Sequence, residues 1–390
     1  MHRAGKKAAR RAERARRRQR IQGREALYLI RHSLANYRNI ESLEFYPATG
    51  VNVVSGENGQ GKTNLLESIF LLTGARSFRG GRDASLVRSG EECARVDADF
   101  FLDGRDQNIR IVVGEKGRTA SLNKGTPTKA AALVGKFCAV VFSPEHLSLV
   151  KGAPELRRRF IDTALCQISS SYLGNIKRYA RLLDQKNSLL KDSRTIAAAG
   201  EMLDVYDAQL ADAACEISNK RSVFVRELLP LAAANYERIS NGRETLDFQY
   251  RSSLFPDGEG DPDEALEAIY AQRAIDIRAG FSTVGPHRDD LFFALDGGDA
   301  KVYASQGQQR CIVLSLKLAE AELMELKLGE RPALLLDDVL SELDERRQNY
   351  LIESLQGCQS VITCCAPELI AARTEAAVFL IEDGRLRERA

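Results

Sequence analysis

Hydrophobic positions change their spacing along the chain, and each spacing predicts a different kind of structure. Residues 138–142 and 333–336 are short, continuous apolar runs, and residues 51–54 form a similar run interrupted only by Asn52. Runs of this kind are typical of strands buried on both faces in a parallel sheet. Residues 96–122 instead alternate apolar and polar side chains, which predicts antiparallel strands packed on the same lobe.

Helical spacing takes over beyond Pro154 and continues to about residue 239. One face of this segment carries large apolar residues at helical intervals, among them Tyr172, Ile176, Tyr179 and Leu183. No heptad repeat persists long enough for an extended coiled coil, so the pattern predicts a compact helical lobe. A strand over 248–254, a polar loop and a short helix to about residue 279 follow.

A glycine-rich segment links the first apolar run to an amphipathic helix predicted over 65–72. It matches G-x-x-x-x-G-K-[ST] and consists of Gly56, Glu57, Asn58, Gly59, Gln60, Gly61, Lys62 and Thr63. In such a loop backbone amides bind the phosphates of ATP, the lysine reaches the outer phosphates and the hydroxyl holds Mg²⁺. Lys62 is therefore a candidate catalytic residue and Thr63 a candidate metal ligand. An ordinary glycine-rich turn is the alternative, which the flanking strand and helix disfavour.

Two carboxylates near the C-terminal end supply another part of an ATPase site. Asp337 and Asp338 end the apolar run 333–336, and a parallel strand delivers its last side chains to the sheet edge where ligands bind. Asp337 is a candidate Mg²⁺ ligand, and Asp338 is a candidate catalytic residue that orients or deprotonates water, with a helix cap as its alternative.

Because Lys62 and Ser305 are 243 positions apart, a second domain must be inserted into the nucleotide-binding fold.

Two further segments have both a structural and a functional interpretation. Ser305, Gly307 and Gln308 precede a helix predicted over 311–326, so they form either an ordinary turn or an anion site at the positive end of that helix. Residues 341–344 directly follow the acidic pair and are either a helix cap or a contact segment.

Together these motifs resemble the ABC-type ATPases and, within them, the RecF family, which shares a wider group with the SMC proteins. The resemblance spans about residues 27 to 385. It rests on the segments 36–39, 56–67, 76–79, 142–145, 157–160, 285–291 and 304–310. It implies an α/β P-loop NTPase of the ABC/SMC-head type with an inserted, compact and mainly helical second domain.

In that superfamily a signature serine and its helix contact the γ-phosphate that the partner subunit binds. The matching positions here are Ser305, Gly307 and Gln308, and the resemblance also adds Arg38 and Asn64 to the nucleotide-binding residues. The segment after the acidic pair matches the family's dimer-contacting loop. The resemblance therefore implies an ATP-dependent homodimer.

For function, the resemblance implies an ATP-dependent DNA-binding protein of recombinational repair and replication-fork maintenance. The ATP-bound dimer would clamp double-stranded DNA next to a single-stranded gap, and weak ATP hydrolysis would release it. RecO and RecR mediators would be recruited so that RecA replaces single-strand-binding protein. The implied setting is the bacterial cytoplasm, in association with the nucleoid, during the response to DNA damage and the SOS response.

The sequence departs from the superfamily pattern in three places. Asp338 stands where a glutamate is usual, so we expect slow hydrolysis. Cys364 and Cys365 stand where a switch histidine is usual, which leaves Thr363 or another group to sense the γ-phosphate. The segment 142–146 offers no lid glutamine, so no metal contact is assigned there.

Composition and charge narrow the class of protein. The chain has 390 residues, 44% of them hydrophobic, which is enough for two domains with a sizeable core. No apolar run approaches the roughly 20 residues that a bilayer span needs, and no secretory signal is evident, which predicts a cytoplasmic protein without membrane contact. The eight cysteines show neither zinc-ligand nor disulfide-framework spacing.

Basic residues are concentrated at the N-terminus. Residues 1–24 hold 11 Lys or Arg and one Glu, which leaves a net charge of −8 on the rest of the chain. We predict a disordered tail, either a nucleic-acid-binding arm or an upstream start-codon artefact, with a mitochondrial presequence disfavoured. Since the body is acidic, DNA contact needs local basic patches. The candidates are Arg76, Arg79, Arg82, Lys116, Arg118 and Arg157 to Arg159, of which at least one of the last three should form an internal salt bridge.

The predicted domains are 25–150 and 276–390 for the two halves of the ATPase fold, with 151–275 as the helical lobe. Three other classes are alternatives. A P-loop kinase would need an acceptor pocket and lid but no signature segment, a transporter ATPase subunit would keep the switch histidine and lid glutamine, and an SMC-like organiser would need hundreds of heptad residues.

Overall fold

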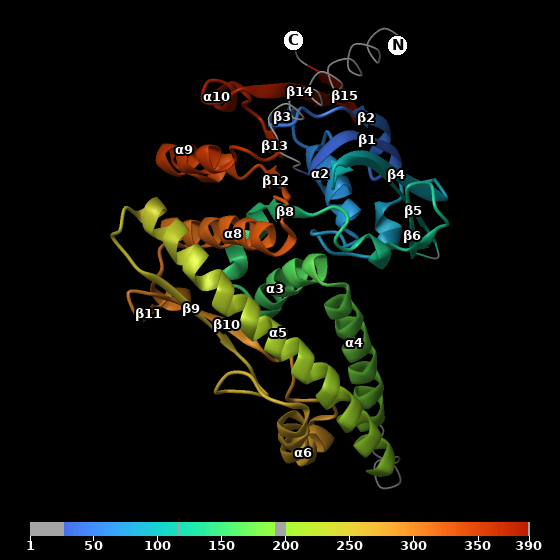
Figure 1. Cartoon of the computed structure of the whole chain (residues 1–390), viewed down its shortest axis with the longest axis vertical. Coiled ribbons are helices and arrows are strands. Elements are labelled where there is room, and N and C mark those ends of the chain that lie inside the picture. The colour runs from blue at the N-terminus through green and yellow to red at the C-terminus, as the bar shows by residue number, and fades with distance from the viewer. Residues whose placement is uncertain (1–26, 116, 192–199, 389–390) are drawn as a thin grey trace. The chain divides into compact units, whose positions relative to one another are not determined.

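The computed structural model describes residues 27–115, 117–191 and 200–388, so the predicted basic tail lies outside the described residues. The chain divides into two compact units. The first comprises residues 1–147 and 317–390, and the second comprises residues 148–316. Figure 1 shows both units with their elements labelled.

The first unit contains a six-stranded sheet in the order β15-β14-β3-β13-β12-β8. All neighbouring pairs are parallel except β14 with β15. The strands are β3 (Val51–Ser55), β8 (Ala139–Phe142), β12 (Ala333–Asp337), β13 (Ser360–Cys364), β14 (Ala376–Glu382) and β15 (Arg385–Glu388). Every residue of β3, β8, β12 and β13 is buried, which explains why the three apolar runs and their neighbour lack alternation.

A second, antiparallel sheet of the same unit has six strands in the order β2-β1-β4-β5-β6-β7. Its strands are β1 (Tyr28–Tyr37), β2 (Ile40–Phe45), β4 (Cys93–Leu102), β5 (Arg105–Gly114), β6 (Gly117–Leu122) and β7 (Thr128–Lys129). Buried and more exposed residues alternate along β4, so the expectation of antiparallel strands over 96–122 is confirmed.

Short helices complete this unit. Helix α2 (Lys62–Phe70) follows the glycine-rich loop and packs on the parallel sheet. The C-terminal part of the unit adds α9 (Glu345–Ser354) and α10 (Glu368–Ala371). Four 3₁₀ turns lie in the same unit, namely Leu71–Thr73, Asp83–Leu86, Ala130–Leu133 and Leu340–Glu342, and the turn Pro144–Leu149 spans the residue at which the second unit begins.

The second unit is mainly helical, as the sequence predicts. Its elements are α3 (Pro154–Ile168), α4 (Ser170–Lys191), α5 (Gly200–Ser240), β9 (Leu246–Arg251), α6 (Pro262–Ala279), β10 (Asp290–Leu295), β11 (Gly298–Asp299), α7 (Ala300–Tyr303) and the first half of α8 (Gln306–Leu328). Within this unit the long helix α5 lies against α4 and α6 (Figure 1). The strands form a small sheet in the order β11-β10-β9.

The second unit extends further along the chain than the sequence predicted. We expected the return to the ATPase fold at residue 276, but the unit ends at Leu316. The reason is the pairing of β10 with β9, which ties residues 290–295 to the helical unit. A strand cannot be assigned to its sheet from its own sequence, which explains the difference between the predicted bound and the end of this compact unit. No helix in the described part of the chain is long and apolar enough to cross a membrane.

Candidate nucleotide site

The glycine-rich loop connects β3 to α2 in the first unit, as its sequence context predicts. Gly61 caps α2 with a left-handed backbone, at a φ of 106°. Gly56 has a φ of 152°, and a Cβ atom there would lie only 2.4 Å from the carbonyl oxygen of Ile381. A side chain at position 56 would therefore push β14 away from the loop.

Lys62 lies at the start of α2 and is only 7% exposed. Its Nζ donates to the carbonyl oxygen of Gly56 and, over 3.1 Å, to that of Glu57. The sulfur of Cys365 lies 3.6 Å from the same nitrogen, and it also lies 3.8 Å from Oδ1 of Asn58. The ammonium group is thus held over the loop at whose backbone the phosphates of a nucleotide would bind.

Asp337 and Thr63 meet at the edge of the parallel sheet, although 274 positions separate them in sequence. The Thr63 hydroxyl donates to Oδ1 of Asp337 over 2.9 Å, and so does the Thr363 hydroxyl over 2.9 Å. Burial raises the pKa of Asp337, and the hydrogen bonds from Thr363 and Thr63 act against this increase.

These donors suit a magnesium ion. Because Thr63 gives its proton to Asp337, the lone pairs of its oxygen remain available for a cation. Within the described residues no group of three His, Cys, Asp or Glu gathers as a metal cage. Mg²⁺ bound with nucleotide commonly uses one or two protein ligands together with phosphate oxygens and water, so Thr63 and Asp337 are a sufficient protein set.

Other predicted nucleotide-binding side chains bond to protein groups around the loop. Oε1 of Gln60 accepts a hydrogen bond of 2.6 Å from the amide of Asp383. The amide group of Asn64 donates to Asn39 over 2.7 Å, and Asn39 donates to the carbonyl oxygen of Gly59 over 2.9 Å. These contacts fix the loop between α2, β14 and the turn after β1.

Arg38 has a carboxylate partner inside the unit. Its guanidinium forms two hydrogen bonds, of 2.7 and 3.0 Å, with the carboxylate of Glu67. Burial works to raise the pKa of Glu67, but hydrogen bonds from Arg38 and Ser77 hold it below its usual value. The arginine therefore anchors the turn after β1 to α2, and its side chain is engaged in this ion pair.

Asp338 has a backbone conformation that the sequence did not signal. Its φ is 51°, in the left-handed region that residues other than glycine seldom adopt. Its amide donates to Thr363 twice, over 3.2 Å to the carbonyl oxygen and over 3.0 Å to the hydroxyl. The backbone of Asp338 is therefore tied to Thr363 at the end of β13.

The signature residues begin α8 in the second unit. Ser305 and Gln308 form a reciprocal cap, in which the Ser305 amide donates to Oε1 of Gln308 over 2.7 Å and the Gln308 amide donates to the Ser305 hydroxyl over 3.3 Å. Gln308 also donates to Glu244 over 2.7 Å. Gly307 lies in the first turn. A helix therefore begins at these residues, and the side chains of Ser305 and Gln308 cap its first turn.

The segment after the acidic pair is also a helix start. Asp344 is the N-cap of α9, and its Oδ1 accepts a hydrogen bond of 3.0 Å from the amide of Arg347. The Ser341 hydroxyl donates to the carbonyl oxygen of Asp338 over 2.7 Å. The local capping prediction is confirmed for Asp344, while its contact with a second subunit stays a prediction.

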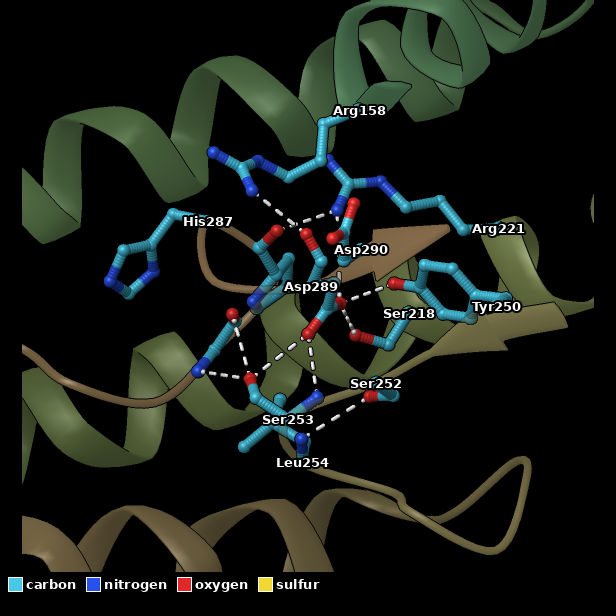
Figure 2. A network of polar contacts seen from close by, with 12 residues as sticks. Arg158, Ser218, Arg221, Tyr250, Ser252, Ser253, Leu254, His287, Asp289 and Asp290 are labelled. Atoms are coloured by element: carbon cyan, nitrogen blue, oxygen red, sulfur yellow. Dashed lines mark hydrogen bonds and ion pairs between the residues drawn. The ribbon is translucent and has the colours of Figure 1, made fainter. Parts of the chain in front are cut away.

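A buried network in the second unit surrounds Asp289, from the segment 285–291 (Figure 2). Its Oδ1 accepts from the amide of Ser253 over 2.7 Å and from the hydroxyl of Ser253 over 2.9 Å. Its Oδ2 accepts from Tyr250 and, over 3.2 Å, from Ser218. Arg221 lies 3.7 Å from the same oxygen. Sequence reasoning missed this network, because these members come from three separate stretches of the chain.

The consecutive arginines of α3 differ in burial, since Arg157 is buried, Arg158 is partly buried and Arg159 is exposed. Arg157 is buried and forms a two-bond ion pair with Asp290, at 2.6 and 3.0 Å, so the predicted internal salt bridge is confirmed. Arg158 donates to the carbonyl oxygen of Asp289 over 2.8 Å. In the first unit Arg118 is likewise bonded to Asp83 over 2.9 Å. The exposed DNA-contact candidates are Arg76, Arg79, Arg82 and Arg159, while Lys116 lies outside the described residues.

His287 forms two side-chain contacts within the second unit. Nδ1 lies 2.6 Å from the Tyr179 hydroxyl, and Nε2 lies 3.0 Å from the carbonyl oxygen of Ser282. Burial lowers the pKa of His287, and the hydrogen bond to Ser282 acts against this decrease. The histidine therefore holds the turn before β10 against α4.

Comparisons with known proteins agree with this geometry. Residues 28–385 match the model for the RecF/RecN/SMC N terminal domain. The DNA replication and repair protein RecF of Bacillus pumilus is 38% identical over 92% of this chain and 100% of its own length. The protein of the same description from Staphylococcus carnosus is 41% identical over 86% of this chain and 92% of its own length.

Solved structures give the same result. The recombination mediator protein RecF in the RecFOR pathway, in its ATP form, superposes with a TM-score of 0.85 at 31% identity over 94% of this chain and 98% of its own. An Smc head domain from Pyrococcus furiosus reaches 0.53 at 14% identity over 93% of this chain and 96% of its own, which shows a shared fold. The parallel sheet carries a phosphate loop and an acidic strand end beside it, and the relatives match nearly the whole length of the chain. This chain therefore belongs to the RecF family of ABC/SMC-type ATPases.

Proposed function

We propose that this chain is an ATP-dependent DNA-binding protein of recombinational repair and replication-fork maintenance. The observation that carries the proposal is the meeting of Thr63 with Asp337, beside Lys62, in a chain that matches RecF proteins over almost all of its length. A RecF protein of similar fold is described in its ATP form, which supports ATP as the ligand of this loop.

The loop amides of Gly56–Thr63 would bind the phosphates, with Lys62 compensating their charge. Thr63 and Asp337 would hold Mg²⁺, whose bound form supplies charge neutralisation to the phosphates. Asp338 would orient the attacking water. Since an aspartate side chain is shorter than the usual glutamate, we propose weak ATPase activity that regulates DNA binding.

The signature residues Ser305, Gly307 and Gln308 would act on the nucleotide of a second copy. ATP would thus join two copies into a homodimer that clamps duplex DNA next to a single-stranded gap. The structural relative belongs to the RecFOR pathway, so we propose RecO- and RecR-type mediators as partners that help to load the recombinase. The setting would be the bacterial cytoplasm, close to the nucleoid.

Light scattering tests this proposal through the molar mass with ATP, with ADP and without nucleotide, each with and without a gapped duplex. The variants are Lys62→Met and Ser305→Arg. We expect ATP to convert monomer to dimer, gapped duplex to strengthen the dimer, and both substitutions to abolish it. A protein that hydrolyses ATP but stays monomeric with ATP and DNA would contradict the clamp.

A further inference from the structure

Thr363 lies on the strand that separates the two motifs of the nucleotide site. Strand β13 pairs with β12 on one side and with β3 on the other, so that Thr363 is opposite both Asp337 and Val54. The threonine is 0% exposed. A hydroxyl group at such a position needs hydrogen-bond partners, because an unsatisfied buried polar group is costly.

Its shorter hydrogen bonds reach two residues at the end of the acidic strand, and a longer contact of 3.4 Å joins it to the carbonyl oxygen of Leu336. The hydroxyl donates to Oδ1 of Asp337 over 2.9 Å and accepts from the amide of Asp338 over 3.0 Å. Because Thr63 donates to the same Oδ1 over 2.9 Å, this oxygen is held from both sides. The carboxylate therefore keeps one orientation, with its other oxygen accepting no hydrogen bond from the described residues.

The backbone of Asp338 supports the same interpretation. Its left-handed φ of 51° is unfavourable for a residue with a side chain and persists only where surrounding groups hold it. Thr363 provides two of those contacts through its hydroxyl and its carbonyl oxygen. Ser341 provides another, on the carbonyl side of Asp338. One threonine thus holds both the carboxylate of Asp337 and the backbone of Asp338.

We propose that Thr363 is a positioning residue of the nucleotide site, which orients Asp337 toward Mg²⁺ and sets the direction of Asp338. The inference rests on the proposed function, since it assumes that Mg-ATP binds here. It also assigns a role to the position before the two cysteines, where the sequence left open what replaces the switch histidine. In this structure the hydroxyl of Thr363 is hydrogen-bonded to Asp337, the last residue of β12, and to the amide of Asp338.

A purely structural threonine would affect stability but not the dependence of ATP binding on magnesium. The test therefore measures the Kd of a fluorescent ATP analogue twice, once with Mg²⁺ and once with EDTA, and compares the ratio of the two values. Thr363→Val removes the hydroxyl at nearly constant volume. We expect the Kd in EDTA to stay within about twofold and the gain from Mg²⁺ to fall by about tenfold.

Thr363→Ser keeps the hydroxyl and should keep most of the gain from Mg²⁺. Thr363→Cys replaces it by a weaker donor and acceptor and should lose the gain as valine does, which provides a second variant if valine unfolds the protein. Thr73→Val is the matched control, because Thr73 is equally buried and its hydroxyl bonds only to backbone, donating to Phe70 and accepting from Ala75. It should retain the wild-type ratio.

The outcomes separate this inference from the proposed function. If the wild type binds the analogue no more tightly with Mg²⁺ than without, the proposed function fails. If the wild type shows the gain and both the valine and cysteine variants keep it, only the role of Thr363 is wrong. If neither variant folds, the hydroxyl serves the fold and the inference is likewise overturned.

Discussion

Asp289 shows what one buried carboxylate contributes to the second unit. It accepts hydrogen bonds from Ser253, Tyr250 and Ser218, and lies beside the guanidinium of Arg221. Asp289→Asn removes the charge and turns an acceptor atom into a donor. We expect a loss of about 3–5 kcal/mol in the free energy of unfolding, since Arg221 is then less well compensated. Urea denaturation followed by circular dichroism measures it.

Asp257→Asn is the control for this prediction, because Asp257 is exposed in the loop between β9 and α6. Surface substitutions of this kind usually change the free energy of unfolding by less than about 0.5 kcal/mol. Equal effects at positions 257 and 289 would show that the network in Figure 2 adds no stability.

His32 predicts how the stability of the first unit depends on pH. It is 0% exposed, its Nε2 lies 2.7 Å from the Ser68 hydroxyl, and burial, helped by the charge of Arg31, lowers its pKa to about 3. In the unfolded chain His32 takes up a proton near pH 6.5, whereas in the folded protein it stays neutral at that pH. The free energy of unfolding therefore falls as the pH falls below about 6.5. From pH 7.5 to 5.5 this one group should cost about 1.4 kcal/mol.

The measurement compares urea midpoints at the two pH values for the wild type and for His32→Gln. The difference between the pH values, rather than the absolute stability, carries the prediction, since the substitution also perturbs packing. His32→Gln should lose about 1.4 kcal/mol less than the wild type over this interval. An identical pH dependence in both proteins would show that His32 is not held neutral by the fold.

At the scale of elements, three helices of the second unit share one buried lysine. Lys186 of α4 is 1% exposed and lies 2.9 Å from Asp207 of α5 and 3.0 Å from Asp276 of α6. Lys186→Met leaves two buried carboxylates without their common cation. We expect a loss of about 3–5 kcal/mol in the free energy of unfolding, measured with urea.

The matched control is Lys177→Met, which changes an exposed lysine on the same helix. It should change the free energy of unfolding by less than about 0.5 kcal/mol. Should the variant at position 186 be as stable as this control, the two carboxylates must take up protons or other partners without cost. Near-neutral stability would then exclude the lysine as the link between the three helices.

The sequence predicted the helices, strands and loops better than it predicted which of them lie side by side in the fold. The phosphate loop, the acidic strand end and the helical lobe follow from local patterns, because each of them depends on residues close together in the chain. The pairing of β10 with β9, which moved a domain boundary to Leu316, depends on contacts across 39 or more positions and has no local signal. The same reason hid the Asp289 network and the link from Thr363 to Asp337.

At the scale of the whole molecule, the proposed dimer makes each ATP site depend on two copies of the chain. One copy would supply the loop with Lys62, and the other would supply the signature residue Ser305. A dimer of Lys62→Met with Ser305→Arg would then contain one site with both defects and one site with none. Two variants that are inactive alone should therefore recover activity when they are mixed.

Because each variant alone is expected to stay monomeric, the dimers in an equal mixture should be heterodimers with one intact site each, and the mixture should show up to about half of the wild-type ATPase activity at the same total concentration. The ATP-dependent dimer should reappear in light scattering at the same time. Mixing each variant with itself at doubled concentration controls for mass action. If the mixture stays inactive although heterodimers form, each copy must complete its own site, and the signature residues would then act within one chain.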